Sequence, residues 1–170
     1  LVDHRDLGVH TELVSDGVVD LIERGVINGV HKQLNRTKTV GTFALGTRRL
    51  YDFLHENTAV ELWPVRYVND PRQISRERGF VSINATLSVD FLGQCASETI
   101  GGQYYSSSGG QNDFARGAAY SEGGQGFIVL HSTTSSGASR IVPQLAPGDA
   151  VSTHKNTVDK VVTEYGVAEL

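Results

Sequence analysis

One carboxylate and one pair of glycines in this 170-residue sequence have types and settings that fit a single chemistry. Glu12 stands just before an apolar helical pattern, and Gly109 and Gly110 lie in a serine-rich loop. A carboxylate can attack an activated acyl group and form a mixed anhydride. The tetrahedral oxyanion on that path needs fixed donors, which glycine N–H groups supply because no Cβ blocks close approach. The pattern therefore permits covalent acyl transfer through Glu12.

Each of these residues also fits a plainer role. A glutamate at a helix entrance interacts favourably with the helix dipole, and a Gly-Gly pair is commonly a turn. His10 is expected to be a packing or hydrogen-bonding neighbour of Glu12 rather than a base, because a carboxylate is already ionised at pH 7. The residues alone leave the catalytic and the structural interpretations open.

Composition and motifs exclude several other classes. The net charge is −4 and no long basic stretch occurs, which argues against nucleic acid as a main partner. The six histidines are scattered and the sequence has one cysteine, so a zinc site is not indicated. Phosphate-binding, dinucleotide-binding and nucleophile-elbow signatures are absent, and no apolar run is long enough for a membrane span.

The lone cysteine and the lack of methionine bear on the origin of the chain. Cys95 cannot form an internal disulfide, which favours a reduced, cytoplasmic compartment. Because the sequence holds no methionine, we expect it to be a fragment of a longer intracellular protein.

The elements that must position these residues alternate between strands and short helices. Residues 8–25 predict a turn followed by an amphipathic helix, with Val14, Val18, Leu21 and Ile22 on one face and Gly25 at its end. Three helices for about seven strands favour a mixed α/β domain, an open mixed sheet flanked by helices, and the length allows one core. The other predicted helices are 47–57 and 112–121, and the predicted strands are 39–46, 59–65, two within 79–102, 126–132, 139–145 and 159–166.

Six ordered blocks carry a resemblance that covers essentially the whole chain: "GVHTELVSDGVVDLIERG", "YVNDPRQI", "VSINATLSVDFLGQ", "SSSGGQNDFARGA", "SRIVPQL" and "VVTEYGVAEL". Together they resemble the C-terminal domain of the acetyl-CoA hydrolase/transferase family. The resemblance implies a CoA-transferase-like α/β domain over residues 1–170, cut from a longer two-domain chain whose N-terminal domain is absent. It also implies that acyl-CoA binds between the two domains.

The resemblance implies a role for each matching residue. Glu12 would be the nucleophile, and Asn69 would lie near the thioester. Gly109 and Gly110 would supply an oxyanion donor and a contact with CoA, and Glu164 would be a second acid close to the site. No metal is implied, and coenzyme A enters only as the acyl-CoA substrate.

In one loop the sequence departs from the family. Ser135 and Ser136 stand where relatives often carry a lysine, so one contact with a CoA phosphate is not carried over.

These roles define three competing functions. The first is an acyl-CoA:carboxylate CoA-transferase, of the 4-hydroxybutyrate or acetate type, acting through a covalent glutamyl-CoA thioester. The second is an acyl-CoA hydrolase such as an acetyl-CoA hydrolase, with water resolving the same intermediate. The third is a non-catalytic CoA-binding or assembly module. The expected partners are acyl-CoA, a small carboxylic acid and the missing N-terminal domain, with homo-oligomer formation left open. The isolated chain is expected to be inactive.

Overall fold

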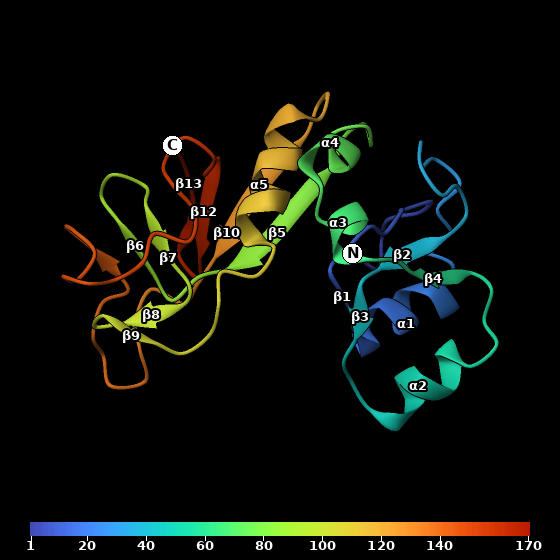
Figure 1. The fold of residues 1–170 in the computed structure, drawn as a ribbon, viewed down its shortest axis with the longest axis horizontal. Helices are drawn as coiled ribbons and strands as arrows, with labels where there is room; N and C mark the ends of the chain where they lie inside the picture. The colour runs from blue at the N-terminus through green and yellow to red at the C-terminus, as the bar shows by residue number, and fades with distance from the viewer. The chain divides into compact units, whose positions relative to one another are not determined.

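The computed structural model describes all residues, Leu1–Leu170, and divides the chain into two compact units (Figure 1). The first unit is Leu1–Arg78 and the second is Gly79–Leu170. The sequence length suggests one core, whereas each unit has a hydrophobic cluster of its own. No helix in either unit combines the length and the apolar character that crossing a membrane requires.

Short parallel strand pairs and four helices build the first unit. Strand β1 pairs with β3, and β2 pairs with β4, both in parallel. Val14, Val19 and Leu50 form the buried cluster of this unit. The elements are β1 (Leu13–Val14), α1 (Asp16–Glu23), β2 (Thr39–Gly41), β3 (Phe43–Ala44), α2 (Arg48–Leu54), β4 (Val60–Leu62), α3 (Val65–Val68) and α4 (Pro71–Ile74).

The first helix is shorter than its sequence pattern suggests. Val14, predicted on the helix face, lies in β1, and Val19 is the buried residue of α1. The pairing of Val14 with Ala44 of β3 accounts for the late start, and Asp16 at the first helical position accepts hydrogen bonds from the amide and hydroxyl of Thr47. The predicted end is confirmed, since Gly25 adopts a φ of +70° directly after the helix cap at Arg24.

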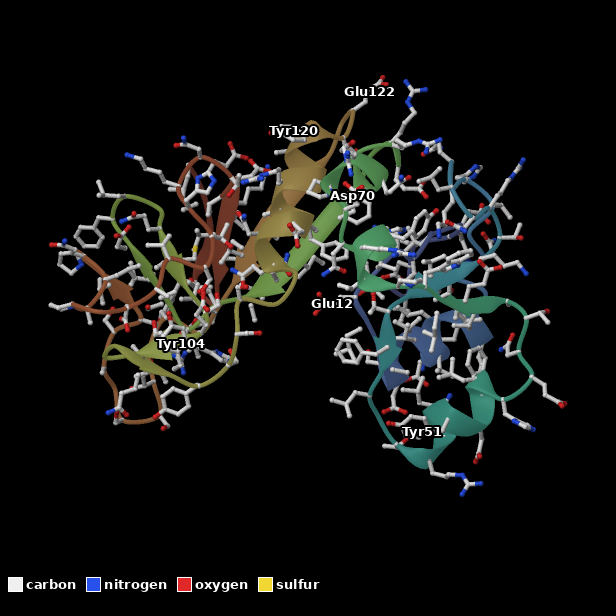
Figure 2. The ribbon with its side chains drawn as sticks, in the orientation of Figure 1. Glu12, Tyr51, Asp70, Tyr104, Tyr120 and Glu122 are labelled. Atoms are coloured by element: carbon white, nitrogen blue, oxygen red, sulfur yellow. The ribbon has the colours of Figure 1, made fainter.

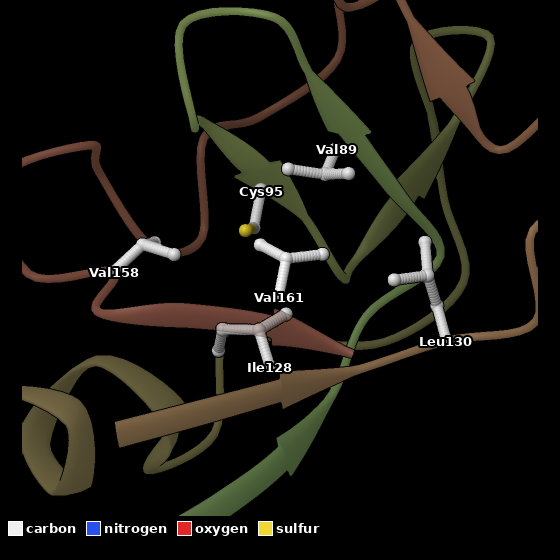
Figure 3. Close-up of a cluster of buried hydrophobic side chains, with 6 residues drawn as sticks. All are labelled: Val89, Cys95, Ile128, Leu130, Val158 and Val161. Carbon is white, nitrogen blue, oxygen red and sulfur yellow. The ribbon is translucent and has the colours of Figure 1, made fainter. Parts of the chain in front are cut away.

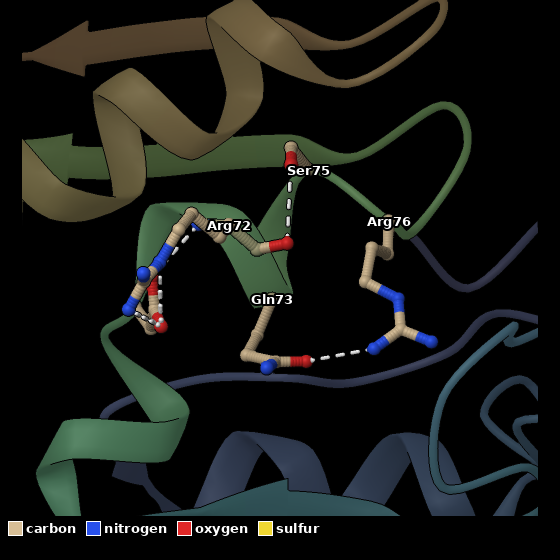
Figure 4. A network of polar contacts seen from close by, with 5 residues as sticks. Arg72, Gln73, Ser75 and Arg76 are labelled. Atoms are coloured by element: carbon tan, nitrogen blue, oxygen red, sulfur yellow. Dashed lines mark hydrogen bonds and ion pairs between the residues drawn. The ribbon is translucent and has the colours of Figure 1, made fainter.

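Helices α3 and α4 are absent from the sequence prediction because four residues are too few to show a helical period. The cap of α4 does follow turn chemistry, with Pro71 at the first turn and the Asp70 side chain accepting from the Arg72 amide. Figure 4 shows the polar contacts around this helix, including the bond from Arg76 Nη1 to Gln73 Oε1. The Arg72–Asp70 ion pair is exposed on its arginine side and adds little stability.

A buried lysine ties the N-terminal segment of the first unit to its neighbours. Lys32 is only 8% exposed, and its Nζ donates to the carbonyl oxygens of Val9 and Lys38, at 2.9 Å each. A Cβ at Gly8 would lie 2.4 Å from Lys32 Cγ, so the lysine stem fills the space that a side chain at position 8 would need. Burial lowers the pKa of Lys32 from 10.5 to about 8.

The second unit is built on a mixed sheet with strand order β13-β12-β10-β5. Strands β5 (Val81–Ala85), β10 (Gln125–Val129) and β12 (Lys160–Thr163) are parallel, and β13 (Gly166–Glu169) is an antiparallel edge strand. Helix α5 (Gln111–Tyr120) packs against β5 and β10. The remaining strands are β6 (Ser88–Asp90), β7 (Cys95–Ala96), β8 (Thr99–Ile100), β9 (Gln103–Tyr104) and β11 (Ile141–Val142).

Apolar side chains from the four-stranded sheet and from a second, three-stranded sheet of order β11-β6-β7 meet in one cluster, which Figure 3 shows from close by. Cys95 is fully buried there, and burial raises the pKa of its thiol to about 12. The cluster consists of Val89, Cys95, Ile128, Leu130, Val158 and Val161.

The predicted class, a mixed α/β fold with open mixed sheets flanked by helices, is confirmed. Its details differ in several places. The predicted strand 39–46 is split into β2 and β3, the predicted strand 159–166 is shortened to β12, and β9 and β13 were not predicted. The structure has five helices rather than three, and residues 79–102 hold four short strands rather than two. Tight turns break this stretch: Asp90 accepts the amides of Leu92 and Gln94, and Gly93 has a φ of +82°.

The buried ammonium of Lys32 should be visible in a titration. Because the pKa falls from 10.5 to about 8 in the fold, the unfolded chain holds its proton more strongly between these values. Burial of the charge therefore destabilises the fold below pH 8, and this cost fades as the pH rises towards 10.5. We expect ¹⁵N NMR of lysine-labelled protein to show one side chain titrating near pH 8, absent from a Lys32→Met variant. Lysine signals that all titrate at ordinary surface values would contradict the burial of this group.

Candidate active site

The backbone of Glu12 is fixed by two neighbouring hydrogen bonds. Its carbonyl oxygen accepts from Thr42 N at 2.9 Å and from Phe43 N at 3.1 Å. The preceding residue, Thr11, donates its amide to Val40 O at 3.0 Å. The side chain of Glu12 is half-buried, and Figure 2 shows it at the surface of the first unit. The carboxylate is thus carried by a hydrogen-bonded segment directly before β1 and remains accessible.

Asn69 meets this carboxylate from the junction between α3 and α4. Its amide donates to Val65 O at 2.8 Å, which closes α3, and Asn69 is only 7% exposed. Asn69 Nδ2 donates to Glu12 Oε2 across 57 positions of sequence. Asn69 Oδ1 is buried and has no hydrogen-bond partner within the protein. The structure therefore brings together the two first-unit residues that the sequence singles out.

His10 contacts the residue next to Asn69. Its Nε2 lies 2.7 Å from Val68 O, the carbonyl just before Asn69. Burial lowers the pKa of His10 below its usual range, and the nearby Lys32 acts in the same direction. The imidazole is therefore neutral at pH 7. His10 thus forms a hydrogen bond to the residue before Asn69, and the expectation that it is not a base stays a prediction.

Gly109 and Gly110 form the turn that starts α5 in the second unit. Gly109 has a φ of +54°, a conformation that favours glycine, and Gly110 is the N-cap residue of α5. Gly110 O accepts from Phe114 N at 3.0 Å, and Gly110 has no side chain that could cap the first turn. Backbone N–H groups at a helix start favour negative charge, so this turn suits an anion or an oxyanion.

Glu164 is held by the serine-rich loop of the second unit. Its carboxylate accepts from Ser132 Oγ at 2.7 Å and from Ser132 N at 2.9 Å. Both bonds lower the pKa of Glu164, and the bond from the Ser132 hydroxyl has the larger effect. In the same loop Ser135 and Ser136 are exposed, and Ser136 Oγ lies 2.9 Å from Thr134 Oγ1.

The parallel sheet explains why these second-unit residues share one edge. Glu164 directly follows β12, and Ser132 comes shortly after its parallel neighbour β10. Carboxyl ends of parallel strands meet at one edge of a sheet, where open α/β folds bind ligands. Helix α5 starts at this edge and runs back along the sheet (Figure 1). Gly109, Gly110 and Glu164 therefore lie at the edge where a ligand is expected.

Sequence reasoning missed Ser132 and Thr42. Ser132 orders the loop through Glu164, and its position at the end of the predicted strand 126–132 is the signal that could have pointed to it. Thr42 donates its amide to Glu12 O, and its buried hydroxyl oxygen has no hydrogen-bond partner within the protein. Nothing in the sequence marks Thr42, because its position opposite Glu12 depends on strand pairing.

Comparison with known proteins gives consistent matches. Residues 46–170 match the acetyl-CoA hydrolase/transferase C-terminal domain. The chain is 57% identical to succinyl-CoA:cyclohexane-1-carboxylate CoA transferase of Geobacter metallireducens, covering 100% of this chain and 39% of that protein. It is 49% identical to 4-hydroxybutyrate coenzyme A transferase of Clostridium kluyveri, and the match covers 100% of this chain and 40% of that protein.

A solved structure extends the likeness to three dimensions. The crystal structure of RipA from Yersinia pestis superposes with a TM-score of 0.94 and 45% identity, over 100% of this chain and 38% of that one. The chain thus spans about two fifths of the length of the relatives it matches. The six sequence blocks, the matched domain and the shared fold agree, and the chain belongs to the acetyl-CoA hydrolase/transferase family.

Proposed function

We propose that this chain carries the nucleophile of an acyl-CoA:carboxylate CoA-transferase that works through a glutamyl-CoA thioester at Glu12. The observation that carries the proposal is the hydrogen bond from the buried Asn69 carboxamide to Glu12 Oε2. Because the buried Asn69 amide donates a hydrogen bond to Glu12 Oε2, it restricts the rotation of the carboxylate and orients Oε1 for attack. CoA-transferases among the relatives act on succinyl-CoA and 4-hydroxybutyrate, by their names, which supports a small carboxylic acid as acceptor.

The proposed reaction needs no net proton transfer. Glu12 Oε1 attacks the thioester carbonyl carbon, the C–S bond breaks, and CoA leaves as thiolate. The resulting acyl-glutamyl anhydride is attacked at the glutamyl carbonyl by the thiolate, which releases the donor acid as carboxylate and leaves glutamyl-CoA. An acceptor carboxylate then reverses these steps and departs as the new acyl-CoA. Every attacking and leaving group is an anion, so no general base is required.

Each anionic step passes through a tetrahedral oxyanion. We assign its stabilisation to the N–H groups of Gly109 and Gly110 at the start of α5, where the helix dipole favours negative charge. Glu164 has a supporting role, because its bonds to Ser132 hold the loop that follows β10. CoA enters as substrate, and we propose that it contacts the Gly109–Gly110 turn.

The relatives are more than twice as long as this chain, which supports a two-domain enzyme. We propose that residues 1–170 act as its C-terminal acyl-CoA hydrolase/transferase domain, with acyl-CoA bound between this part and an N-terminal domain. Acyl-CoA, a small carboxylic acid and that domain are then the partners of the chain.

Removing the charge of Glu12 should stop turnover. Glu12→Gln in the full-length protein keeps the shape of the side chain but removes the anionic nucleophile, so we expect kcat to fall by several orders of magnitude. Glu23→Gln, on the exposed side of α1, is the matched control and should leave kcat unchanged. Borohydride added during exposure to acyl-CoA should reduce a thioester at Glu12, detected by peptide mass spectrometry.

A Glu12→Gln protein that keeps a tenth of the wild-type kcat would refute the mechanism. Absence of a trapped residue together with tight CoA binding would favour the non-catalytic module. Product analysis with and without an acceptor acid separates a transferase from an acyl-CoA hydrolase, because only a hydrolase releases free CoA at full rate without the acceptor.

The oxyanion role of the α5 start is testable at Gly110. Its φ of −92° lies near the range of proline, whereas the φ of +54° at Gly109 does not. Gly110→Pro removes the N–H, and we expect kcat to fall by about 10²–10³, the usual loss for one such donor. Gly110→Ala keeps the N–H and is the control. Equal kcat values for both variants would show that this amide has no part in catalysis.

The chain by itself should bind and turn over acyl-CoA poorly. Correct positioning of a substrate can account for about 7–11 kcal/mol of barrier lowering. A chain without the N-terminal domain lacks the contacts with acyl-CoA that we assign to that domain. We expect residues 1–170 to unfold cooperatively yet to show almost no CoA transfer beside the full-length enzyme. Comparable specific activities would mean that the site is complete within this chain and that the two-domain arrangement is wrong.

A further inference from the structure

His10 and Glu12 stand on one short segment that leads into β1. His10 forms a parallel bridge with Val40, and β1 begins directly after Glu12. Both side chains reach the chain that leaves α3, since His10 contacts Val68 O and Glu12 contacts Asn69 Nδ2.

The two contacts form adjacent cross-links between the same two segments. One joins His10 to Val68 and the other joins Glu12 to Asn69, so consecutive residues of the α3 end bind alternate residues of the Glu12 segment. Val68 is fully buried, and His10 is 6% exposed. The last carbonyls of a helix lack partners within it, and His10 supplies one for Val68. The imidazole thereby holds the backbone at Val68, directly before Asn69.

The carbonyl of Val68 decides which tautomer His10 adopts. A carbonyl oxygen only accepts, so Nε2 must carry the hydrogen. The groups facing the ring are Lys32 and Glu77, which oppose each other in charge, and the Tyr67 ring, whose centroid lies 6.2 Å from that of His10. The neutral imidazole is thus a fixed donor, and it does not need to exchange a proton during turnover.

We infer that His10 is a positioning residue for Glu12: its Nε2–H bond to Val68 O holds the end of α3 where the Asn69 carboxamide meets the Glu12 carboxylate. This inference rests on the proposed function, because it assigns the tether a role in catalysis. His10 itself touches neither substrate nor reacting atoms, and its effect passes through Asn69.

The test compares two replacements in the full-length protein. His10→Phe keeps a ring but removes the donor, and His10→Gln carries an amide donor at nearly the reach of Nε2. Small displacements of a catalytic group cost up to about 100-fold in rate, so we expect His10→Phe to lower kcat about 10- to 100-fold. KM for acyl-CoA should stay within about twofold, and His10→Gln should recover kcat to within about fivefold of wild type.

A double-mutant cycle separates positioning from general stability. If His10 acts through Asn69, adding His10→Phe to Asn69→Ala should lower kcat by less than about threefold, because the group to be positioned is gone. An equal loss in both backgrounds, or a His10→Gln protein no better than His10→Phe, would overturn the inference.

A measurement on the unaltered protein does not depend on the folding of any variant. ¹⁵N NMR of the histidine rings should show His10 as the Nε2–H tautomer at pH 7. The Nδ1–H tautomer, which has no hydrogen on Nε2, would overturn the inference. Glu12→Gln serves as the separate control: if that variant keeps its activity, the proposed function fails, whatever the tautomer of His10.

Discussion

The hydrogen bond from the buried Asn69 carboxamide to the half-buried Glu12 carboxylate is the constraint on which the geometry of the candidate site in the first unit depends. A polar group taken out of water must find a partner, and an unsatisfied one costs about 1–3 kcal/mol. Asn69 satisfies its N–H on Glu12 while its Oδ1 is left without a partner in the protein. The paired strands fix the Glu12 backbone and the short helix α3 fixes Asn69, so both ends of this bond are held by regular structure.

The second unit places its candidate residues in a different way, at one edge of a parallel sheet. The helix of a crossover connection starts at the carboxyl edge of the strands, so its first N–H groups lie at that edge. Gly110 caps α5 without a side chain, and the Glu164 carboxylate accepts hydrogen bonds from Ser132. Main-chain geometry therefore sets the start of α5, while Glu164 orders the loop that follows β10.

Sequence patterns predicted what depends on local signals. The end of α1 at Gly25 and the extent of α5 each follow from neighbouring residues, and both are confirmed. Patterns failed where distant segments decide the outcome: Val14 pairs with Ala44 in a strand instead of joining the helix, and Lys32 reaches Val9 from 23 positions away. Glu12 and Asn69 were identified through resemblance to a family. Their contact could not be predicted, because no local rule relates residues 57 positions apart.

The packing of Lys32 against Gly8 has an evolutionary consequence. The stem of the lysine occupies the volume of a missing side chain, and its ammonium joins Val9 to Lys38. A larger residue at position 8 would displace the lysine side chain. A shorter residue at position 32 would leave a cavity and remove the hydrogen-bond donor of the Val9 and Lys38 carbonyl groups. Neither change is neutral alone, so the two positions should vary together among homologues. Variation at position 32 is thereby coupled to position 8, which lies four residues before Glu12 in the sequence.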